Sequence, residues 1–267
     1  MKKIYDQHVH SYYSFDSDQP IEEYLDKAIK LGLEYFVLTD HCDLNYLDKG
    51  QDIFFDIKKQ HQELEELQKK YPNIKILKGI EIGYKPSELD RINQIIKDND
   101  FDIINLSLHE SDGIDYYFKE EFLKLGVRET LKIYFKRQLE AVRGFNDYDV
   151  FSHIDYGFKT AYQADKSIKL CEYEDIVIEI LKEIIKNNKA LEINTKVQKE
   201  LPKEHTIYLL NLYKSLGGKY ITVSSDAHNL KRFYEGIDEY LELIKEAGFN
   251  HITYFIKRNK KAFNLNR

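Results

Sequence analysis

The chain has 267 residues, 42% of them hydrophobic and 32% charged, which suits a soluble globular protein with a sizeable core and excludes a disordered chain. Its net charge of −6 leaves no basic excess for contacts with phosphate backbones, so we expect no nucleic-acid partner.

The cysteines and the first residues indicate a reducing compartment. Cys42 and Cys171 are the only cysteines and form no Cys-x-x-Cys pair, so neither a disulfide framework nor a thiolate zinc site is expected. The amino terminus lacks the apolar core of a signal peptide, and no apolar run approaches the length of a membrane span. We therefore expect a cytoplasmic protein with no membrane partner, and the sequence leaves its oligomeric state open.

Short apolar segments alternate with amphipathic, charge-rich segments along the whole chain. There is no low-complexity linker and no repeat of fixed length, which predicts a single domain over residues 1–267. The predicted strands are 3–7, 35–39, 75–80, 102–107, 149–152, 190–194 and 220–224. The segments with helical periodicity are 21–31, 55–70, 89–99, 116–145, 173–187, 204–216 and 233–247.

The first predicted helix, 21–31, has Pro20 at its start and Gly32 at its end, as capping preferences require. The segment 116–145 fits one long helix or two. Alternation of seven strands with seven helical segments predicts a parallel α/β fold, either a barrel or a doubly wound open sheet.

Polar residues gather where the predicted strands end, and this is where parallel α/β folds carry their functional groups. On a strand, His8 and His10 would point to the same side, roughly 7 Å apart. The other polar residues at strand ends are His41, Glu81, His109, His153, Glu192, Asn194, Asp226 and His228. An open sheet would not bring all seven ends to one point, so we favour a closed or nearly closed (β/α)7-type barrel.

Six of the nine histidines lie at these strand ends, whereas His61, His205 and His251 are expected at the surface. Six imidazoles beside Glu81 and Asp226 would be electrostatically untenable without cations, because buried unpartnered ionisable groups cost several kcal/mol each. Nitrogen and carboxylate ligands without thiolates suit Zn, Mn or Fe(II). Eight or nine ligands exceed the needs of one ion, so we expect two or three divalent ions.

Taken together, these motifs resemble the polymerase-and-histidinol-phosphatase (PHP) family over nearly the whole chain. The motifs are His8-Val9-His10-Ser11 with Asp16, Thr39-Asp40-His41, Gly79-Ile80-Glu81, His109, Ser152-His153-Ile154-Asp155 and Ser225-Asp226-Ala227-His228. The segment 192–195, Glu-Ile-Asn-Thr, is most similar to the histidinol phosphatase branch. The resemblance implies a distorted (β/α)7 barrel with a trinuclear metal site at the carboxyl ends of its strands.

The resemblance also implies three groups of metal ligands. The first metal would be held by His8, His10, Glu81 and Asp226. Glu81 would bridge to the second metal, completed by His109 and His153. Asp16, with Asp18 as a nearby rival, would hold the third metal together with His41 and His228.

The implied activity is hydrolysis of a small phosphate monoester, most specifically L-histidinol phosphate to L-histidinol and phosphate in histidine biosynthesis. A metal-bridging hydroxide would attack in line with the leaving alkoxide. Asp226 and His228 are candidates to position the water and to help the leaving group, and Lys159 is the candidate phosphate contact. After Thr195 the family commonly has a small residue and glycine, whereas this chain has Lys196, which leaves the substrate contacts of that loop open.

Glu110, Asp112 and Asp115 are candidates to receive the substrate's ammonium group, although a solvated loop explains them equally well. Four alternatives compete with the histidinol phosphatase hypothesis. A PHP-type phosphodiesterase or exonuclease is disfavoured by the acidic pI, and a phosphotyrosine phosphatase would differ only in its substrate loops. A non-catalytic metal-binding barrel should lack ligands, and none is missing. An amidohydrolase would have a bridging lysine where this chain has Glu81.

Overall fold

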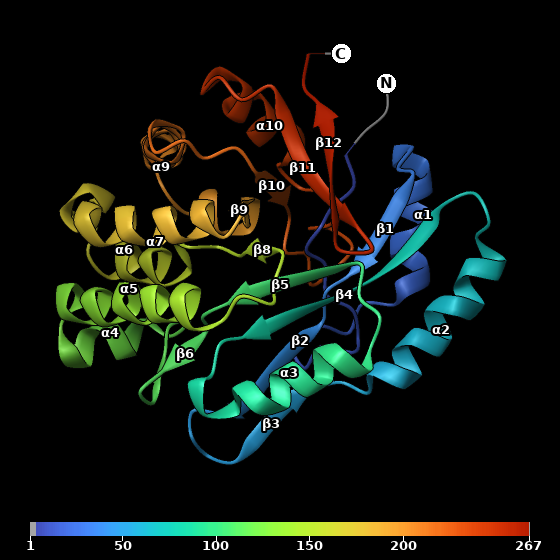
Figure 1. Ribbon diagram of the computed structural model, residues 1–267, viewed down its shortest axis with the longest axis horizontal. Coiled ribbons are helices and arrows are strands. Elements are labelled where there is room, and N and C mark those ends of the chain that lie inside the picture. Colours follow the sequence, from blue (N-terminus) through green and yellow to red (C-terminus); the bar gives the residue numbers. More distant parts are fainter. Residues whose placement is uncertain (1–3, 267) are drawn as a thin grey trace.

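A mostly parallel sheet forms the centre of the computed structural model, which describes residues 4–266 (Figure 1). Its strands run in the order β10 (Ile221–Ser224), β9 (Ala190–Asn194), β8 (Val150–Phe151), β5 (Ile103–Ser107), β4 (Lys75–Gly83), β2 (His41–Tyr46) and β3 (Gln51–Phe54). The eighth strand, β1 (Tyr35–Leu38), pairs with the first half of β4, and β2 pairs with its second half. Within this sheet, as far as the described residues show it, β3 alone runs antiparallel to its neighbour.

The prediction of a strand over 3–7 is wrong for residues 4–7, while Lys3 lies outside the described residues. Side chains rather than a backbone ladder bind this segment: Asp6 accepts hydrogen bonds from the amides of Ser225 and Tyr234, at 2.9 and 3.1 Å. Further along, Val9 makes a single parallel bridge with Ala227.

The segment around Val9 lies between the ends of β10 and β1. The His10 amide donates to the carbonyl of Ala227, and the Thr39 amide donates to the carbonyl of Val9, both at 2.8 Å. Among residues 4–266 the strand pairs do not close into a ring, so a barrel is not confirmed. The parallel α/β architecture is confirmed, with these few bonds joining its two sides.

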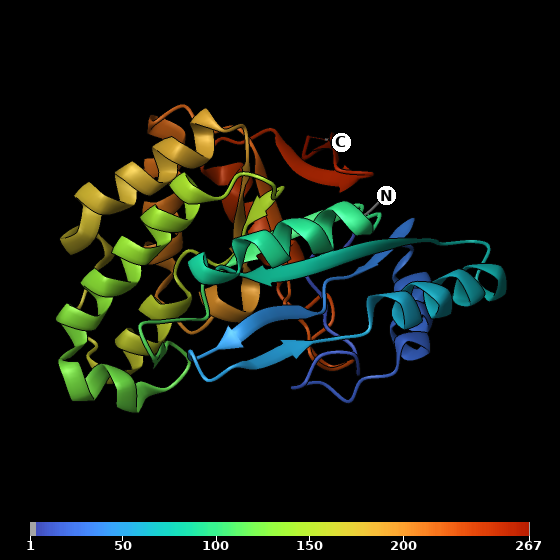
Figure 2. The same cartoon turned by 60° about the horizontal axis from the view of Figure 1, so that its bottom comes forward.

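Helices cover both sides of the sheet. They are α1 (Ile21–Leu31), α2 (Ile57–Lys70), α3 (Leu89–Asp98), α4 (Lys119–Leu125), α5 (Val127–Gly144), α6 (Tyr156–Ala164), α7 (Glu174–Lys186), α8 (Thr195–Gln198), α9 (Lys203–Ser215) and α10 (Ile237–Glu246), with short 3-10 turns at Pro86–Glu88 and Leu170–Tyr173. Helices α4 to α7 (green to yellow) pack together on one side of the molecule, and α1 and α2 (blue and teal) lie on the other (Figure 2). Within residues 4–266, no helix combines the length and apolar composition needed to cross a bilayer.

Local chemistry explains the helix ends. Gly32 closes α1 with φ 76° and donates its amide to Ala28 and Ile29, which confirms the predicted end. Gly126, with φ 90°, divides the segment 116–145 into α4 and α5. Helices α2, α3, α7 and α9 begin and end within two residues of the predicted bounds, whereas α6 and α8 were not predicted.

Three hairpins were not predicted. They are formed by β2 and β3, by β6 (Glu110–Ser111) and β7 (Ile114–Asp115), and by β11 (His251–Ile256) and β12 (Asn259–Asn264). The first hairpin matters most for the site, because β2 carries His41 and places it opposite Glu81 on β4.

Candidate metal centre and active site

Glu81 lies at the centre of a cluster of buried imidazoles. Its Oε1 atom is 2.9 Å from His153 Nε2, 3.2 Å from His8 Nε2 and 3.3 Å from His109 Nε2. Burial alone would raise the pKa of Glu81, but the surrounding imidazoles, led by His8, lower it well below its usual range. This carboxylate therefore contacts histidines from three separate segments of the chain.

The second oxygen of Glu81 connects to the rest of the predicted ligand set. Glu81 Oε2 is 3.0 Å from His41 Nδ1 and 3.5 Å from His10 Nε2. His10 Nε2 is in turn 3.4 Å from Asp226 Oδ1. The segment around His10, near the amino terminus, and the segment that follows β10 thus meet at one place.

Asp16 and His228 complete the cluster at its exposed edge. Asp16 Oδ2 lies 3.0 Å from His228 Nε2, and Asp16 Oδ1 lies 3.6 Å from His41 Nε2. Asp16, and not its rival Asp18, thus makes the contacts with the two histidines. The structure brings together all nine predicted metal ligands.

The cluster fits divalent metal ions. Five buried atoms of these residues make no hydrogen bond of normal geometry in the described part of the chain: His8 Nε2, His10 Nε2, His41 Nδ1, Glu81 Oε2 and His153 Nδ1. All but His153 Nδ1 nevertheless face another atom of the cluster at 3.0–3.5 Å. Orphaned buried polar atoms are costly, and convergent ones indicate a missing partner. Four overlapping groups have ligand atoms within 4.8 Å of one another: His8–Glu81–His153, His8–His10–Asp226, His41–Glu81–His109 and His10–His41–His228. Imidazole and carboxylate donors of this kind suit zinc, manganese or iron.

Two carboxylates orient the histidines from outside the cluster. Glu192 Oε1 lies 2.9 Å from His8 Nδ1, and its Oε2 accepts the His153 amide at 2.8 Å. Asp43 Oδ1 lies 2.8 Å from His109 Nδ1. Burial would raise the pKa of Asp43, but His109 and then His41 lower it to about 2. Such carboxylate–histidine pairs fix ring orientation and tautomer at metal sites.

The sequence did not single out Asp43, because it lies on β2, a strand that was not predicted. Its position two residues after His41 was the available signal, since alternate residues on a strand share a face. Glu192 was recognised at a strand end but was given no role.

Two residues of the cluster have strained backbones. His153 and Asp226 have φ values of 23° and 50°, in a region that non-glycine residues avoid. Each such residue costs about 1–3 kcal/mol and persists only where its surroundings fix it. The contacts of His153 with Glu192, and of Asp226 with Asn194 Nδ2 at 3.2 Å, supply that restraint.

A cavity of about 510 Å3 opens above the cluster, and two lysines line it. Lys159 on α6 is 8% exposed, and its Nζ lies 4.7 Å from the centre of the Tyr156 ring. Lys196 on α8 lies 3.2 Å from both Asp226 Oδ1 and His228 Nδ1. Burial and then the Lys196 ammonium lower the pKa of Lys159 to about 8. Lys196 had been noted only as a departure from the family pattern.

The three acidic residues predicted to receive an ammonium group separate in space. Asp115 lines the cavity and accepts a hydrogen bond from the Tyr46 hydroxyl at 2.5 Å. Glu110 and Asp112 line a different cavity. Glu110 pairs with Lys85 at 2.8 Å, and Asp112 is bound by Arg137 at 2.7 Å. The structure does not bring these last two to the histidine cluster.

The remaining histidines do not all lie at the surface. His251 is exposed and His61 is half-buried. The prediction for His205 is wrong: it is 8% exposed, and its Nε2 lies 2.9 Å from Asp155 Oδ2. Helical periodicity could not reveal this contact, because Asp155 is 50 residues away.

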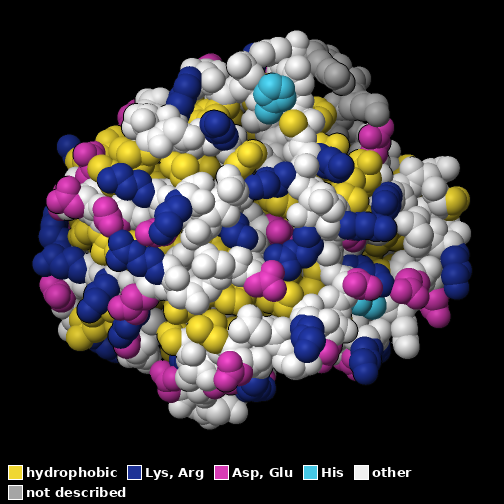
Figure 3. Space-filling model, viewed as in Figure 1, with side chains coloured by type: hydrophobic (Ala, Val, Ile, Leu, Met, Phe, Trp, Pro, Cys, Tyr) yellow, Lys and Arg dark blue, Asp and Glu magenta, His cyan; other side chains and the backbone are white. Residues whose placement is uncertain are grey.

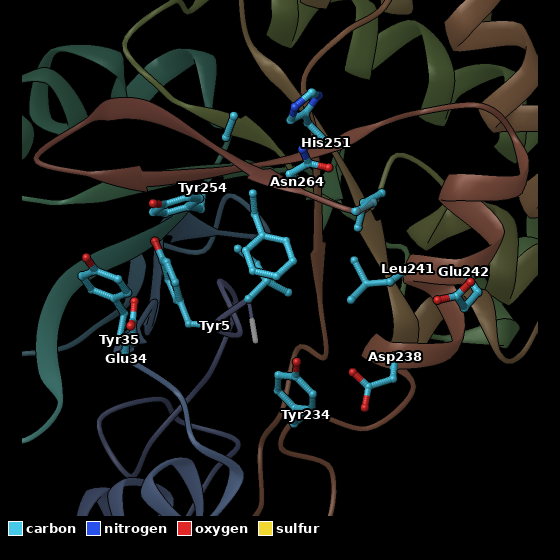
Figure 4. A pocket seen from close by; sticks show the side chains of 14 residues that line it. Tyr5, Glu34, Tyr35, Tyr234, Asp238, Leu241, Glu242, His251, Tyr254 and Asn264 are labelled. Carbon is cyan, nitrogen blue, oxygen red and sulfur yellow. The ribbon is translucent and has the colours of Figure 1, made fainter. Parts of the chain in front are cut away.

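A second cavity, of about 670 Å3, lies away from the cluster, beside the β11–β12 hairpin (Figure 4). Tyr5, Tyr35 and Tyr254 lie close together on one side of it, and Asp238 and Glu242 lie on the other. Among residues 4–266, none of the groups of three possible metal ligands lies there. The groups of possible metal ligands in this part of the chain all belong to the histidine cluster.

Comparison with known proteins agrees with this geometry. The PHP domain matches residues 6–196. The chain is 36% identical over 270 residues to a protein named histidinol-phosphatase from Lactococcus lactis, covering 98% of this chain and 99% of that one. It is 35% identical over 227 residues to a probable histidinol-phosphatase from Clostridium acetobutylicum, covering 84% and 86%.

A solved structure of a histidinol phosphate phosphatase has a similar fold. The crystal structure of histidinol phosphate phosphatase from Lactococcus lactis, complexed with zinc, L-histidinol and phosphate, matches with a TM-score of 0.84 and 34% identity, over 98% of this chain and 100% of that one. The chain belongs to the PHP family.

Proposed function

We propose that this protein is a metal-dependent phosphatase that hydrolyses L-histidinol phosphate to L-histidinol and phosphate, a step of histidine biosynthesis. The observation that carries the proposal is the buried cluster around Glu81 with Lys159 and Lys196 beside it in one cavity. Metal cations and two ammonium groups at one place suit the dianion of a phosphate monoester. The relative from Lactococcus lactis supports this substrate.

The nine clustered residues would hold two or three ions of zinc, manganese or iron. Following the family resemblance, we assign His8, His10, Glu81 and Asp226 to one ion, His109 and His153 with a shared Glu81 to a second, and Asp16, His41 and His228 to a third. Close groups within the cluster, such as His8–His10–Asp226, and the contact of Asp16 with His228 support this division. Bound metal ions would withdraw charge from the phosphoryl oxygens and make water a nucleophile at neutral pH.

The chain's own residues would orient the phosphate and move the proton. Lys159 and Lys196 bind phosphate oxygens as point charges. Asp226, with Asn194 on its Oδ2, positions the attacking water. The His228 side chain is 14% exposed against 5% for Asp226, so His228 is better placed to give a proton to the leaving alkoxide at the cavity surface.

The mouth of the cavity suits a leaving group with a ring and an amine. Phe15, Tyr117 and Phe118 line it and are 67%, 60% and 50% exposed. Such exposed aromatic faces offer stacking to a flat heterocycle. Asp115, which also lines the cavity, provides a carboxylate for an ammonium group.

The proposal is tested by turnover with defined metals. Protein stripped with a chelator and reloaded with zinc or manganese is assayed on L-histidinol phosphate, an aryl phosphate and a single-stranded oligonucleotide. We expect metal-dependent turnover, with kcat/KM highest for L-histidinol phosphate. Turnover without metal would overturn the mechanism, and preference for the oligonucleotide would assign the chain to the nuclease side of the family.

Surface charge supports a small substrate. Lys and Arg side chains are interspersed with Asp and Glu over the face seen in Figure 3, rather than gathered into a basic groove for nucleic acid. Both cysteines, Cys42 and Cys171, are free thiols, and on that basis we propose a cytoplasmic location.

A further inference from the structure

We propose that Asp155, His205 and Gln198 form a buried joint that positions Lys159 and Lys196 for phosphate binding. The inference rests on the proposed function, since it concerns the two lysines beside the metal centre. His205 and Gln198 act here as positioning residues and contact no reacting atom.

The joint begins with a buried carboxylate that does not play its usual local role. Asp155 is 1% exposed and stands at the N-cap position of α6, where an aspartate commonly accepts a backbone amide of the first helical turn. Its side chain makes no such bond. Asp155 Oδ2 instead accepts Gln198 Nε2 at 2.5 Å and lies 2.9 Å from His205 Nε2.

The partners of Asp155 come from two other helices. Gln198 ends α8 and His205 lies in the first turn of α9. The Thr206 hydroxyl donates to Gln198 Oε1 at 2.7 Å, so both ends of this amide are held. The His205 ring also packs against Phe158 on α6, with ring centroids 4.8 Å apart. One polar network therefore fixes α6, α8 and α9 together.

Each lysine lies within one turn of the joint. The Lys159 amide donates to the Asp155 carbonyl at 2.8 Å, so Lys159 follows Asp155 by one helical turn. Lys196 precedes Gln198 by two residues on α8, which spans only Thr195–Gln198. A helix this short has almost no stability of its own, so tertiary contacts must set its position.

Charge adds to the need for fixed positions. Burial lowers the pKa of Lys159 most and the Lys196 ammonium lowers it further, whereas the carboxylates of Asp226, Glu200 and Asp155 raise it. The two ammonium groups repel each other, and in the absence of an anion this repulsion favours separation of α6 and α8. Hydrogen bonds to a buried carboxylate resist that separation, because charge-assisted bonds are about twice as strong as neutral ones. The site is thereby held ready for phosphate.

The test measures binding of inorganic phosphate to metal-loaded enzyme by calorimetry, which requires no turnover. His205→Leu removes the donor to Asp155, and we expect phosphate to bind about tenfold more weakly, because small displacements of positioning groups cost this much or more. KM for an aryl phosphate should rise by a similar factor, with a smaller change in kcat and full metal content. His205→Gln, which keeps a donor, should restore binding to within about threefold.

His61→Leu, a half-buried histidine on α2, is the matched control and should leave phosphate binding unchanged. Should His205→Leu not fold, Thr206→Val frees one end of the Gln198 amide with little change in volume, and it should weaken phosphate binding in the same direction. Unchanged phosphate affinity in a folded, metal-loaded variant overturns the inference, as does loss of metal together with affinity. Failure of the proposed substrate would leave the phosphate measurement intact, so the two outcomes are distinguishable.

Discussion

Some single side chains contact many of the other residues in this site, and Glu81 is the clearest case. Its two oxygens lie within 3.5 Å of nitrogen atoms from five histidines, which are His8, His10, His41, His109 and His153. One carboxylate can satisfy that many imidazoles only where cations share the cluster. Substitutions here should therefore change metal content before they change the fold.

His10→Gln should lower metal content and activity together while the protein stays folded. His10 is fully buried, and its Nε2 faces Asp226 Oδ1 at 3.4 Å and Glu81 Oε2 at 3.5 Å, a spacing that suits ligands of one metal ion. We expect loss of bound metal by elemental analysis and a fall in kcat/KM of about 100-fold or more. An unchanged circular dichroism spectrum is the control. Full activity in this variant would contradict the assignment of His10.

Asp43→Asn should weaken metal binding, although Asp43 is not itself a predicted metal ligand. The amide cannot provide the charge that faces His109 Nδ1 at 2.8 Å, so the ring loses its fixed orientation. Outer partners of this kind are worth about 10–100-fold in metal affinity or activity. Metal titration of the stripped protein measures the effect, with Asp52→Asn on the exposed surface as the control. Equal affinities in the two variants would remove Asp43 from the site.

The lowered pKa of Lys159 predicts that kcat/KM falls at alkaline pH. Its pKa is lowered to about 8 by burial and then by Lys196, so the ammonium is present below that pH and is lost as the pH rises through it. Phosphate binding needs the cation, so kcat/KM should fall above pH of about 8. Lys159→Arg keeps its charge and should move this fall to higher pH. An identical fall in both enzymes would assign it to another group.

At the level of elements, the helices were more predictable than the hairpins. Pro20 and Gly32 mark α1 because capping is a local property. The β11–β12 turn has no such mark: Lys257 and Arg258 both have positive φ, at 49° and 58°, where Asn or Gly is usual. Their amides donate to Asp102, each at 2.8 Å, so tertiary contacts override local preference.

Arg258→Ala should therefore loosen this hairpin. The guanidinium bonds Asp147 at 2.7 Å and the buried Asp149 at 2.9 Å. Loss of these charge-assisted bonds should lower the free energy of unfolding by about 1–2 kcal/mol. Urea denaturation measures this decrease in the free energy of unfolding. Lys257→Asn, which suits positive φ, is expected to be neutral or stabilising, and equal destabilisation by both changes would refute this explanation.

At the scale of the whole molecule, the sequence predicted the clustering of the histidines and carboxylates better than the pairing of the strands. Parallel strands bring their carboxyl ends together, so histidines at those ends could be assigned to one site. Pairing between distant strands leaves no local pattern, and the barrel expected from the motifs is not confirmed. The roles that we propose for Lys196 and His205 were missed for the same reason, since their partners are distant in the chain. One domain over residues 1–267 stays a prediction.

Metal removal should destabilise the entire protein, because the ligands extend from His8 to His228 and link both ends of the chain. Metal at 100 times its dissociation constant stabilises the folded state by about 2.7 kcal/mol per site. For a protein of this size that corresponds to roughly 5–10 °C in Tm. Calorimetry with and without chelator should show this decrease as one transition, as a single domain requires. In the His10→Gln variant, chelator should lower Tm by less. A Tm that is insensitive to chelator in the native protein would mean that metal does not join these segments.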